Sequence, residues 1–284
     1  MRSAVLIAVA GLLVSTACAS TTTTTGGVAS TTSGPTTGQF VWHDLSTDDL
    51  PAAQRFYGGL LGWEFREATR LGARYVVASH AGRAVGGLVA VAPVAGQEVS
   101  QWVAYASVAN VDAAVAAVEQ AGGRTLIAPL DVPSAGRAAV VIDPQGAVLG
   151  LARLTGGDPA DPPAPEEGTF FWMEYLARDP AAAASFYTST FGYQQEVTER
   201  LGPNAYVVLS LNRPRAGILP LPQADMRPVW LPSILVADPA ALATRATALG
   251  GTVLLAPHPD VRKGSLAVVA DPSGAIVALQ KYPF

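Results

Sequence analysis

An internal repeat constrains this chain more than any other feature of its sequence. The stretch Phe40–Glu64 (FVWHDLSTDDLPAAQRFYGGLLGWE) returns 130 residues later as Phe170–Gln194 (FFWMEYLARDPAAAASFYTSTFGYQ). Each copy predicts a short strand, a turn and an amphipathic helix that ends at a glycine. A repeat at a fixed offset indicates that the chain contains two copies of one unit, and any fold has to accommodate both.

The elements expected after each copy also recur in the same order. A matching turn lies near the end of each module, Asp143-Pro144-Gln145-Gly146 and Asp271-Pro272-Ser273-Gly274, 128 residues apart. The patterns predict an α+β fold with two tandem modules, each made of paired βαβββ units with eight strands and two helices on one side. The expected strands cover 74–79, 83–91, 101–108, 124–128, 138–142, 147–154, 206–211 and 230–236, and the expected later helices cover 111–121 and 239–249.

The repeat and the composition together set the expected domain limits. Module 1 runs over 39–155, a Pro- and acid-rich linker over 156–168, and module 2 over 169–284. Residues 19–38 are nearly all Thr, Ser, Gly and Ala, and such a segment buries too little apolar surface to offset its ordering entropy. We therefore expect residues 19–38 to form a flexible tether in front of the folded modules.

The first 18 residues, MRSAVLIAVAGLLVSTAC, have the features of an export signal. Arg2 supplies the positive start, an apolar run follows, and small residues precede Cys18. A cysteine after small residues resembles the lipobox of bacterial lipoproteins, with a departure at Ser15, where that motif usually has an aliphatic residue. The resemblance implies lipidation of Cys18 and an extracytoplasmic, membrane-anchored protein; plain secretion and an uncleaved anchor are the alternatives.

Charge and cysteine content exclude several classes of function. The net charge is −4 and no basic run occurs, which argues against a nucleic-acid partner. Cys18 is the only cysteine, so a disulfide within a monomer and a Cys-rich metal site are both excluded. Two modules in one chain can pair with each other, and we therefore expect a monomer.

The residues at the two ends of each module resemble one known family. The pattern D…FY…LGW, here Asp49, Phe56-Tyr57 and Leu61-Gly62-Trp63, and the closing DPxGA turn are similar to those of the vicinal oxygen chelate superfamily. Its members include glyoxalase I, extradiol dioxygenases, fosfomycin-resistance enzymes and bleomycin-binding proteins. The resemblance implies that each module curls into a half-open barrel whose cavity takes the ligand.

In metal-using relatives, three positions of each half hold the metal ligands. Counting from the family's motifs places on them the residues Trp42, Gly150 and Val103 in module 1 and Trp172, Ala278 and Leu231 in module 2, with Trp102 and Trp230 as the third pair if a bulge shifts the count. None of these side chains can donate a lone pair to a divalent cation. The chain thus resembles a tandem, metal-less branch of the superfamily, and we expect no metal and no cofactor.

Two carboxylates stand out as candidate functional groups. Asp44 and Glu174 each lie two residues after a tryptophan, on the same strand face, so each module places a carboxylate beside an indole. In an apolar cavity such a carboxylate has a raised pKa and could act as acid or base, or bind a cationic or hydroxylated ligand; a structural ion pair is the plain alternative. The predicted ligand-binding residues are Trp42, Asp44, Tyr105, Trp172, Glu174 and Gln280.

The same tryptophans can equally be core residues. His43 faces away from the predicted cavity, with Leu45, and is expected to be packed toward the helices.

Three hypotheses about the function follow. The first is a lipid-anchored protein that binds a small organic molecule without metal, as bleomycin-binding relatives do. The second is a glyoxalase-like lyase or related enzyme that uses Asp44, Glu174 or an unrecognised metal site, and the third is a structural or interaction protein with filled cavities.

Overall fold

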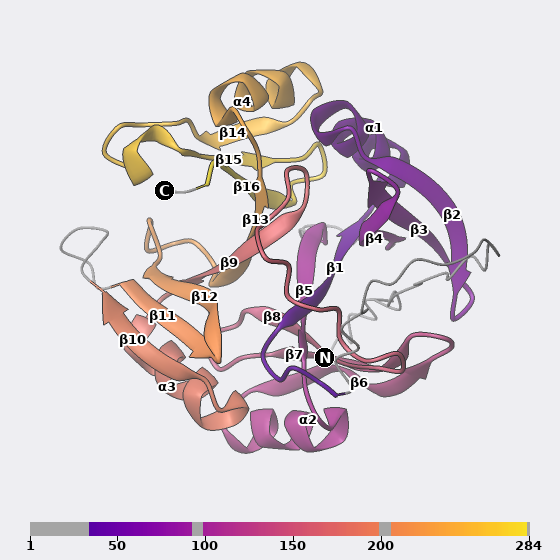
Figure 1. The fold of residues 1–284 in the computed structure, drawn as a ribbon, viewed down its shortest axis with the longest axis vertical. Helices are drawn as coiled ribbons and strands as arrows, with labels where there is room; N and C mark the ends of the chain where they lie inside the picture. Colours follow the sequence, from indigo (N-terminus) through magenta and orange to yellow (C-terminus); the bar gives the residue numbers. More distant parts are fainter. Residues whose placement is uncertain (1–33, 93–98, 199–205, 283–284) are drawn as a thin grey trace, which may run out of the picture.

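The computed structural model describes residues 34–92, 99–198 and 206–282 (Figure 1). The predicted signal segment 1–18 with Cys18 and most of the predicted tether lie outside the described residues. Among the helices that are described, none has the length and apolar character needed to cross a membrane.

Module 1 forms one eight-stranded sheet with the order β2-β3-β4-β1-β5-β8-β7-β6. Strands β1 and β4 run parallel, as do β5 and β8, and antiparallel β1 and β5 join the two βαβββ units at the centre. Its elements are β1 (Phe40–Thr47), α1 (Leu50–Leu61), β2 (Glu64–Arg70), β3 (Ala73–His80), β4 (Arg83–Ala90), β5 (Gln101–Ser107), α2 (Val111–Gln120), β6 (Arg124–Val132), β7 (Gly136–Ile142) and β8 (Val148–Leu154).

Module 2 repeats this sheet with the order β10-β11-β12-β9-β13-β16-β15-β14, which confirms the predicted α+β fold of doubled βαβββ units. Its elements are β9 (Phe170–Ala177), α3 (Pro180–Phe191), β10 (Gln194–Thr198), β11 (Tyr206–Leu211), β12 (Arg213–Pro220), β13 (Val229–Leu235), α4 (Pro239–Ala248), β14 (Thr252–Leu255), a 3-10 turn (Arg262–Gly264), β15 (Leu266–Ala270) and β16 (Ile276–Gln280). Both sheets are strongly curved (Figure 1).

The repeated sequence explains why the same helix forms twice. Asp49 and Asp179 cap α1 and α3 by accepting a hydrogen bond from the backbone N–H of Ala52 and Ala182, and a proline stands in the first turn of each helix. Gly62 and Gly192 end the helices in the left-handed conformation, which glycine adopts without a steric penalty. The shared caps therefore fix the same entry and exit for the chain in both modules.

The helices lie where the two modules meet, α1 beside α4 and α2 beside α3 (Figure 1). One buried cluster joins α1 side chains such as Phe56 to Ala246 of α4 and Leu279 of β16. A second cluster joins Val115 of α2 to Phe186 of α3 and Leu209 of β11. Because each core takes side chains from both modules, neither module can bury its outer face by itself.

His43 illustrates this shared interface. Its ring stacks on Phe170 at a centroid distance of 4.0 Å, and Nε2 lies 3.4 Å from the Met173 sulfur. Burial lowers the pKa of His43 to about 3, so the imidazole is neutral in the folded protein. The prediction of a packed histidine is confirmed, but its neighbours are residues of β9 rather than a helix, because β1 and β9 meet across the interface.

Two matching hydrogen-bond chains tie the modules together. Trp102 Nε1 donates to the Tyr57 hydroxyl at 2.8 Å, and that hydroxyl donates to Asp271 of module 2 at 3.3 Å. In the mirrored arrangement, Trp230 Nε1 donates to the Tyr187 hydroxyl at 2.9 Å, and that hydroxyl donates to Asp143 of module 1 at 3.0 Å. Trp102 and Trp230 therefore serve the junction and do not face a cavity.

The segments predicted as tether end and linker are held against the modules. The Thr36 N–H donates to Asp158 at 2.5 Å, and the Gly38 N–H donates to the Ser107 carbonyl at 2.8 Å. Asp161 of the linker pairs with the buried Arg215 at 2.5 Å. Thr36 and Gly38 therefore contact the rest of the fold although the sequence places them in the tether, because their backbone N–H groups find acceptors there.

Candidate functional site

The concave faces of the two sheets carry the predicted site residues. Strand alternation places Trp42 and Asp44 on this face of β1, opposite His43 and Leu45, and Trp172 and Glu174 on the corresponding face of β9. The register places Tyr105 beside Trp42 in module 1, and Ser233 beside Trp172 in module 2. Each module therefore gathers an indole and a carboxylate on one face.

In module 1 the carboxylate is enclosed. Asp44 is fully buried, and its Oδ1 accepts from Trp42 Nε1 at 2.8 Å and from the Tyr75 hydroxyl at 2.7 Å. Burial raises the pKa of Asp44 to about 7, against the opposing effect of these hydrogen bonds and of Arg70. Asp44 is therefore a carboxyl group that exchanges its proton near neutral pH.

Aromatic and aliphatic side chains fill the rest of this face. Tyr105 lies over Gly150, where a side chain would collide with the phenol ring. A buried apolar cluster surrounds this pair, with members Val41, Trp42, Val103, Tyr105, Val132, Ala135, Ala138, Val140, Ala152 and Leu154. The second predicted metal position of module 1 is thus covered by the phenol of Tyr105.

In module 2 the carboxylate is paired with an arginine. Glu174 Oε1 accepts from Trp172 Nε1 at 2.8 Å and from the Tyr206 hydroxyl at 2.9 Å, and it forms a short ion pair with Arg262. Arg262 also donates to Gln280 Oε1 at 2.9 Å. The guanidinium group therefore joins Glu174 on β9 to Gln280 on β16 across the face of the sheet.

The backbone at Arg262 is unusual. Arg262 and the following Lys263 both have positive φ angles, 46° and 55°, in a region that residues with a Cβ rarely occupy. Such conformations persist only where the surrounding structure imposes them, and they occur often at functional sites. Here the contacts with Glu174 and Gln280 hold the side chain over the concave face.

Three buried polar atoms on this face of module 2 have no hydrogen-bonding partner within the protein: Glu174 Oε2, Gln280 Nε2 and Ser233 Oγ. Buried polar groups without a partner cost free energy, and native structures contain few of them. Trp172, at the edge of this group, is partly exposed, whereas its counterpart Trp42 is buried. The module 2 face therefore combines hydrogen-bonding capacity with an aromatic side chain that solvent can reach.

The donor chemistry at the metal positions does not fit a divalent cation. Trp42 and Trp172 use their indole N–H groups as donors to carboxylates, and Trp102 faces the module junction instead of the cavity. Across the described residues, no group of three or more His, Cys, Asp or Glu side chains is placed to hold a metal ion. The side chains at these positions therefore supply no ligand set for a metal.

The structure brings together most of the residues that the sequence singled out. Trp42, Asp44 and Tyr105 meet in module 1, and Trp172, Glu174 and Gln280 meet in module 2. Their tyrosine and arginine partners were not among the predicted residues; these partners are Tyr75, Arg70, Tyr206 and Arg262. The two tyrosines recur at nearly the repeat offset and could have been found, whereas the arginines differ between the modules.

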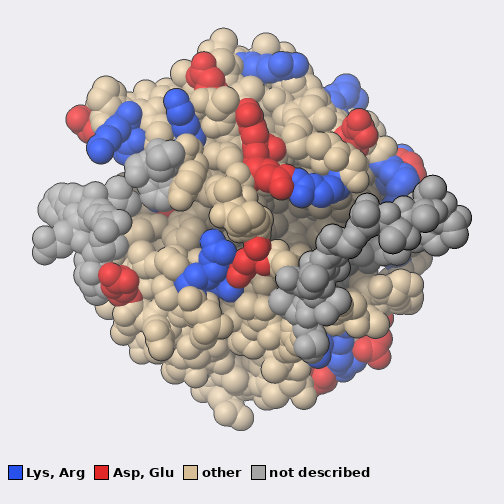
Figure 2. Space-filling model, in the orientation of Figure 1, with Lys and Arg blue, Asp and Glu red and all other residues tan. Residues whose placement is uncertain are grey.

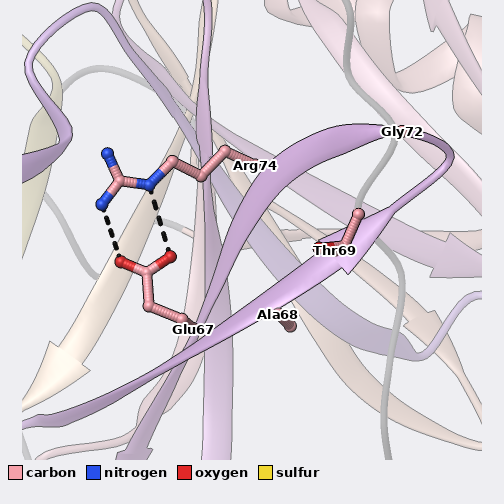
Figure 3. Close-up of a pocket in the computed structure, with 5 residues that line it drawn as sticks. All are labelled: Glu67, Ala68, Thr69, Gly72 and Arg74. Carbon is pink, nitrogen blue, oxygen red and sulfur yellow. Dashed lines mark hydrogen bonds and ion pairs between the residues drawn. The ribbon is translucent and has the colours of Figure 1, made fainter.

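The described part of the molecule also has a surface hollow of about 390 Å³ at the β2–β3 hairpin, lined by Glu67, Ala68, Thr69, Gly72 and Arg74 (Figure 3). Its polar side chains Glu67 and Arg74 form an exposed ion pair with each other, with Oε1 and Nη2 2.8 Å apart. The hollow therefore offers no unsatisfied charged group to a ligand. On the face shown in Figure 2, basic side chains lie among acidic ones.

Comparison with known families agrees with this geometry. Residues 38–151 match the model of the Glyoxalase/Bleomycin resistance protein/Dioxygenase superfamily, and residues 161–279 match that of the Glyoxalase-like domain. The chain belongs to the glyoxalase/bleomycin resistance protein/dioxygenase superfamily. The superfamily resemblance predicted from the repeat is thereby confirmed, and both of its copies here are family domains.

Curated relatives align with most of the chain. A putative glyoxylase, CFP32 of Mycobacterium bovis, is 32% identical over 247 residues, which are 84% of this chain and 93% of the relative. The anthracycline biosynthesis protein DauV of a Streptomyces species is 31% identical over 255 residues, 84% of this chain and 91% of the relative.

Solved structures share the fold at low sequence identity. The Mn(II)-bound glyoxalase from Novosphingobium aromaticivorans has a TM-score of 0.58 at 18% identity, covering 86% of this chain and 82% of that chain. The 2,3-dioxygenase LapB from a Pseudomonas species has a TM-score of 0.57 at 15% identity, covering 88% and 94%. At this identity the likeness supports the superfamily fold alone.

Proposed function

We propose that this superfamily member binds a small organic molecule, without a metal ion, on the concave face of module 2. The observation that carries the proposal is the set of unpartnered atoms, Glu174 Oε2, Gln280 Nε2 and Ser233 Oγ, beside the partly exposed Trp172. A flat ligand can stack on the indole while its polar groups bond to these atoms. Ligand sequestration, as in the bleomycin-resistance members of the family, is the version of this role that we favour.

The pairing of Glu174 with Arg262 indicates the charge of that ligand. Because the carboxylate already has a cationic partner, the site has little net charge to offer an ionic ligand. Glu174 Oε2 can accept a hydrogen bond from a hydroxyl or amide group, and Gln280 Nε2 can donate one to a carbonyl. A neutral, flat molecule with both a donor and an acceptor therefore satisfies the site.

The test starts with mass spectrometry of small molecules that co-purify with the native protein, followed by a thermal-shift screen of aromatic hydroxy and amide compounds. We expect Ser233→Tyr, which copies the filled arrangement of module 1, to abolish the response, and Gln280→Leu to weaken it. The matched control Tyr105→Phe, in module 1, should respond like the wild type. Stoichiometric divalent metal in the purified protein, or a response that survives Ser233→Tyr, would contradict the proposal.

A glyoxalase-like or related enzymatic activity is the second candidate. The observation in its favour is Asp44, whose pKa of about 7 suits proton transfer at neutral pH. That activity requires substrate to reach a carboxyl group now covered by Trp42, Tyr75 and Tyr105. Loss of a catalysed reaction in Asp44→Asn, but not in Ser233→Tyr, would support this candidate over binding in module 2. If neither a bound ligand nor a catalysed reaction is found, the result would favour the third hypothesis, a structural or interaction protein with filled cavities.

We further propose that Cys18 is lipidated and anchors a monomer outside the cytoplasm. The support is the apolar segment followed by small residues and Cys18, and a Ser/Thr-rich spacer in front of the modules. Metabolic labelling with a palmitate analogue should mark the wild-type protein and leave Cys18→Ala unmarked. Equal labelling of both proteins would rule the anchor out.

A further inference from the structure

A buried arginine on the concave face of module 1 lacks the ion pair that its counterpart in module 2 makes. Arg70, at the end of β2, is only 6% exposed, and its guanidinium carbon lies 4.7 Å from the ring centroid of Tyr75. Both terminal nitrogens, Nη1 and Nη2, are buried and have no hydrogen-bonding partner within the protein. None of the ion pairs between described residues includes Arg70, whereas Arg262 of module 2 is ion-paired with Glu174.

Asp44, which lies near Arg70, also has a buried polar atom without a hydrogen-bonding partner. Asp44 shares Tyr75 with Arg70, since the Tyr75 hydroxyl donates to Asp44 Oδ1 at 2.7 Å. The other oxygen, Asp44 Oδ2, is buried without a partner within the protein. A guanidinium group offers two parallel N–H donors in the geometry that a carboxylate accepts, and burial strengthens that attraction.

We propose that module 1 holds a second site, for a small carboxylate anion bound by the two terminal nitrogens of Arg70 beside Asp44 Oδ2. The anion neutralises the guanidinium charge and accepts both of its free N–H groups, and the protonated Asp44 can donate from Oδ2. Trp42 donates to Asp44 and lies beside Tyr105, so this face is closely packed, and acetate is the smallest suitable carboxylate to use as a probe. This site is distinct from the module 2 site and does not depend on the function proposed there.

Binding at this site is coupled to proton uptake. Burial holds the pKa of Asp44 at about 7, and a bound anion disfavours the ionised carboxylate further by charge repulsion. The other titratable or charged groups that face Asp44 are Arg70 on β2, Tyr75 on β3 and Tyr105 on β5, and the tyrosines keep their protons over this range because burial raises the pKa of both. Affinity should therefore fall about tenfold between pH 6 and pH 8, as Asp44 loses its proton.

The experiment titrates the full protein with ¹³C-labelled acetate by NMR at pH 6 and pH 8, at constant ionic strength in chloride. Acetamide, which has the same shape and no charge, is the ligand control. We expect saturable acetate binding at pH 6, at least tenfold stronger than that of acetamide and about tenfold weaker at pH 8. Equal binding of the two compounds would overturn the proposal.

Three variants test whether the anion binds at Arg70 itself. Arg70→Gln should lose acetate binding, and Arg66→Gln, which removes an exposed charge from the same strand, should keep it. Asp44→Asn should bind acetate with little dependence on pH. Equal losses in Arg70→Gln and Arg66→Gln would reduce the effect to general electrostatics and refute the site, and the urea midpoint of each variant shows whether it is folded.

Discussion

The two modules place the same indole, carboxylate and tyrosine on the same strands, yet they treat the carboxylate in opposite ways. In module 1, Asp44 has no ion-pair partner among the described residues, and burial raises its pKa to about 7. In module 2, Glu174 is ion-paired with Arg262, which reaches it from the turn before β15. The difference lies in residues outside the shared part of the repeat, since the 128-residue offset places Ser134 opposite Arg262 and Ala152 opposite Gln280.

This comparison shows how one scaffold produces two different environments. In module 1, Tyr105 and its apolar neighbours fill the face around Gly150, and the buried atoms without protein partners belong to Asp44 and Arg70. In module 2 such atoms belong to Ser233, Gln280 and Glu174, beside the partly exposed Trp172. A filled face contributes to stability, and a polar, incompletely bonded face contributes binding capacity at some expense of stability. We therefore expect the two modules to bind different ligands, an organic molecule in module 2 and a small anion in module 1.

The largest expected effect is the loss of Arg262. Arg262→Gln leaves the Glu174 carboxylate buried without its cation, and should lower the free energy of unfolding by about 3–5 kcal/mol. Arg70→Gln, the matching change in module 1, removes an unpaired guanidinium and should change it by less than about 1 kcal/mol. Urea unfolding of both variants makes the comparison. Equal losses of unfolding free energy would show that Arg70 has a protein partner comparable to Glu174. The double variant Glu174→Gln/Arg262→Gln should recover part of the stability that Arg262→Gln loses.

A second effect is the pH dependence of the protein's stability, to which two adjacent buried residues of β1, His43 and Asp44, contribute. Asp44 keeps its proton to about pH 7 when folded but loses it near pH 4 when unfolded, so its contribution to stability falls as pH rises through this range. His43 stays neutral to about pH 3 when folded but gains a proton near pH 6.5 when unfolded, so its contribution rises with pH up to about 6.5. These two slopes oppose each other.

Single variants should expose each slope. Asp44→Asn leaves the His43 contribution, so its stability should rise between pH 4 and pH 6.5 relative to the wild type. His43→Phe keeps the ring stacked on Phe170 and leaves the Asp44 contribution, so its stability should fall over the same range. Each change is on the order of 4 kcal/mol at most. Unfolding curves at several pH values measure both, and parallel pH profiles for the two variants would contradict the assignment.

The smallest expected difference is between the two junction chains. Tyr57→Phe and Tyr187→Phe each remove a hydroxyl that joins a tryptophan N–H to a carboxylate of the other module, and each should cost about 1–3 kcal/mol. Because the hydrogen bonds match in both halves, the two costs should agree within about 1 kcal/mol. Thermal unfolding should remain a single transition in both. A variant in which the modules unfold separately would show that the shared cores do not couple them.

The fold, and the tryptophan and carboxylate of each site, could be predicted from the repeated residues, because these residues act on their near neighbours in sequence. Asp49 and Asp179 cap helices within their own turn, and the alternation of a strand places Trp42 with Asp44 and Trp172 with Glu174 without reference to the rest of the chain. Arg262 lies 88 residues from Glu174 in sequence, and no local pattern indicates such a pairing. The predictions of lipidation at Cys18, of a metal-free site and of a monomer stay predictions.

The sequence by itself determined the tandem architecture. Helix caps and turn residues act over only a few residues, and the same pattern of them occurs twice in the chain. Tertiary structure alone decided that the helices bury their faces in cores shared by both modules and that Tyr57 and Tyr187 bond to the opposite module. It also decided which carboxylate is paired and which is not. The physical reason is that burial and electrostatic pairing depend on distances between residues far apart in the chain, and only the closed sheets set those distances.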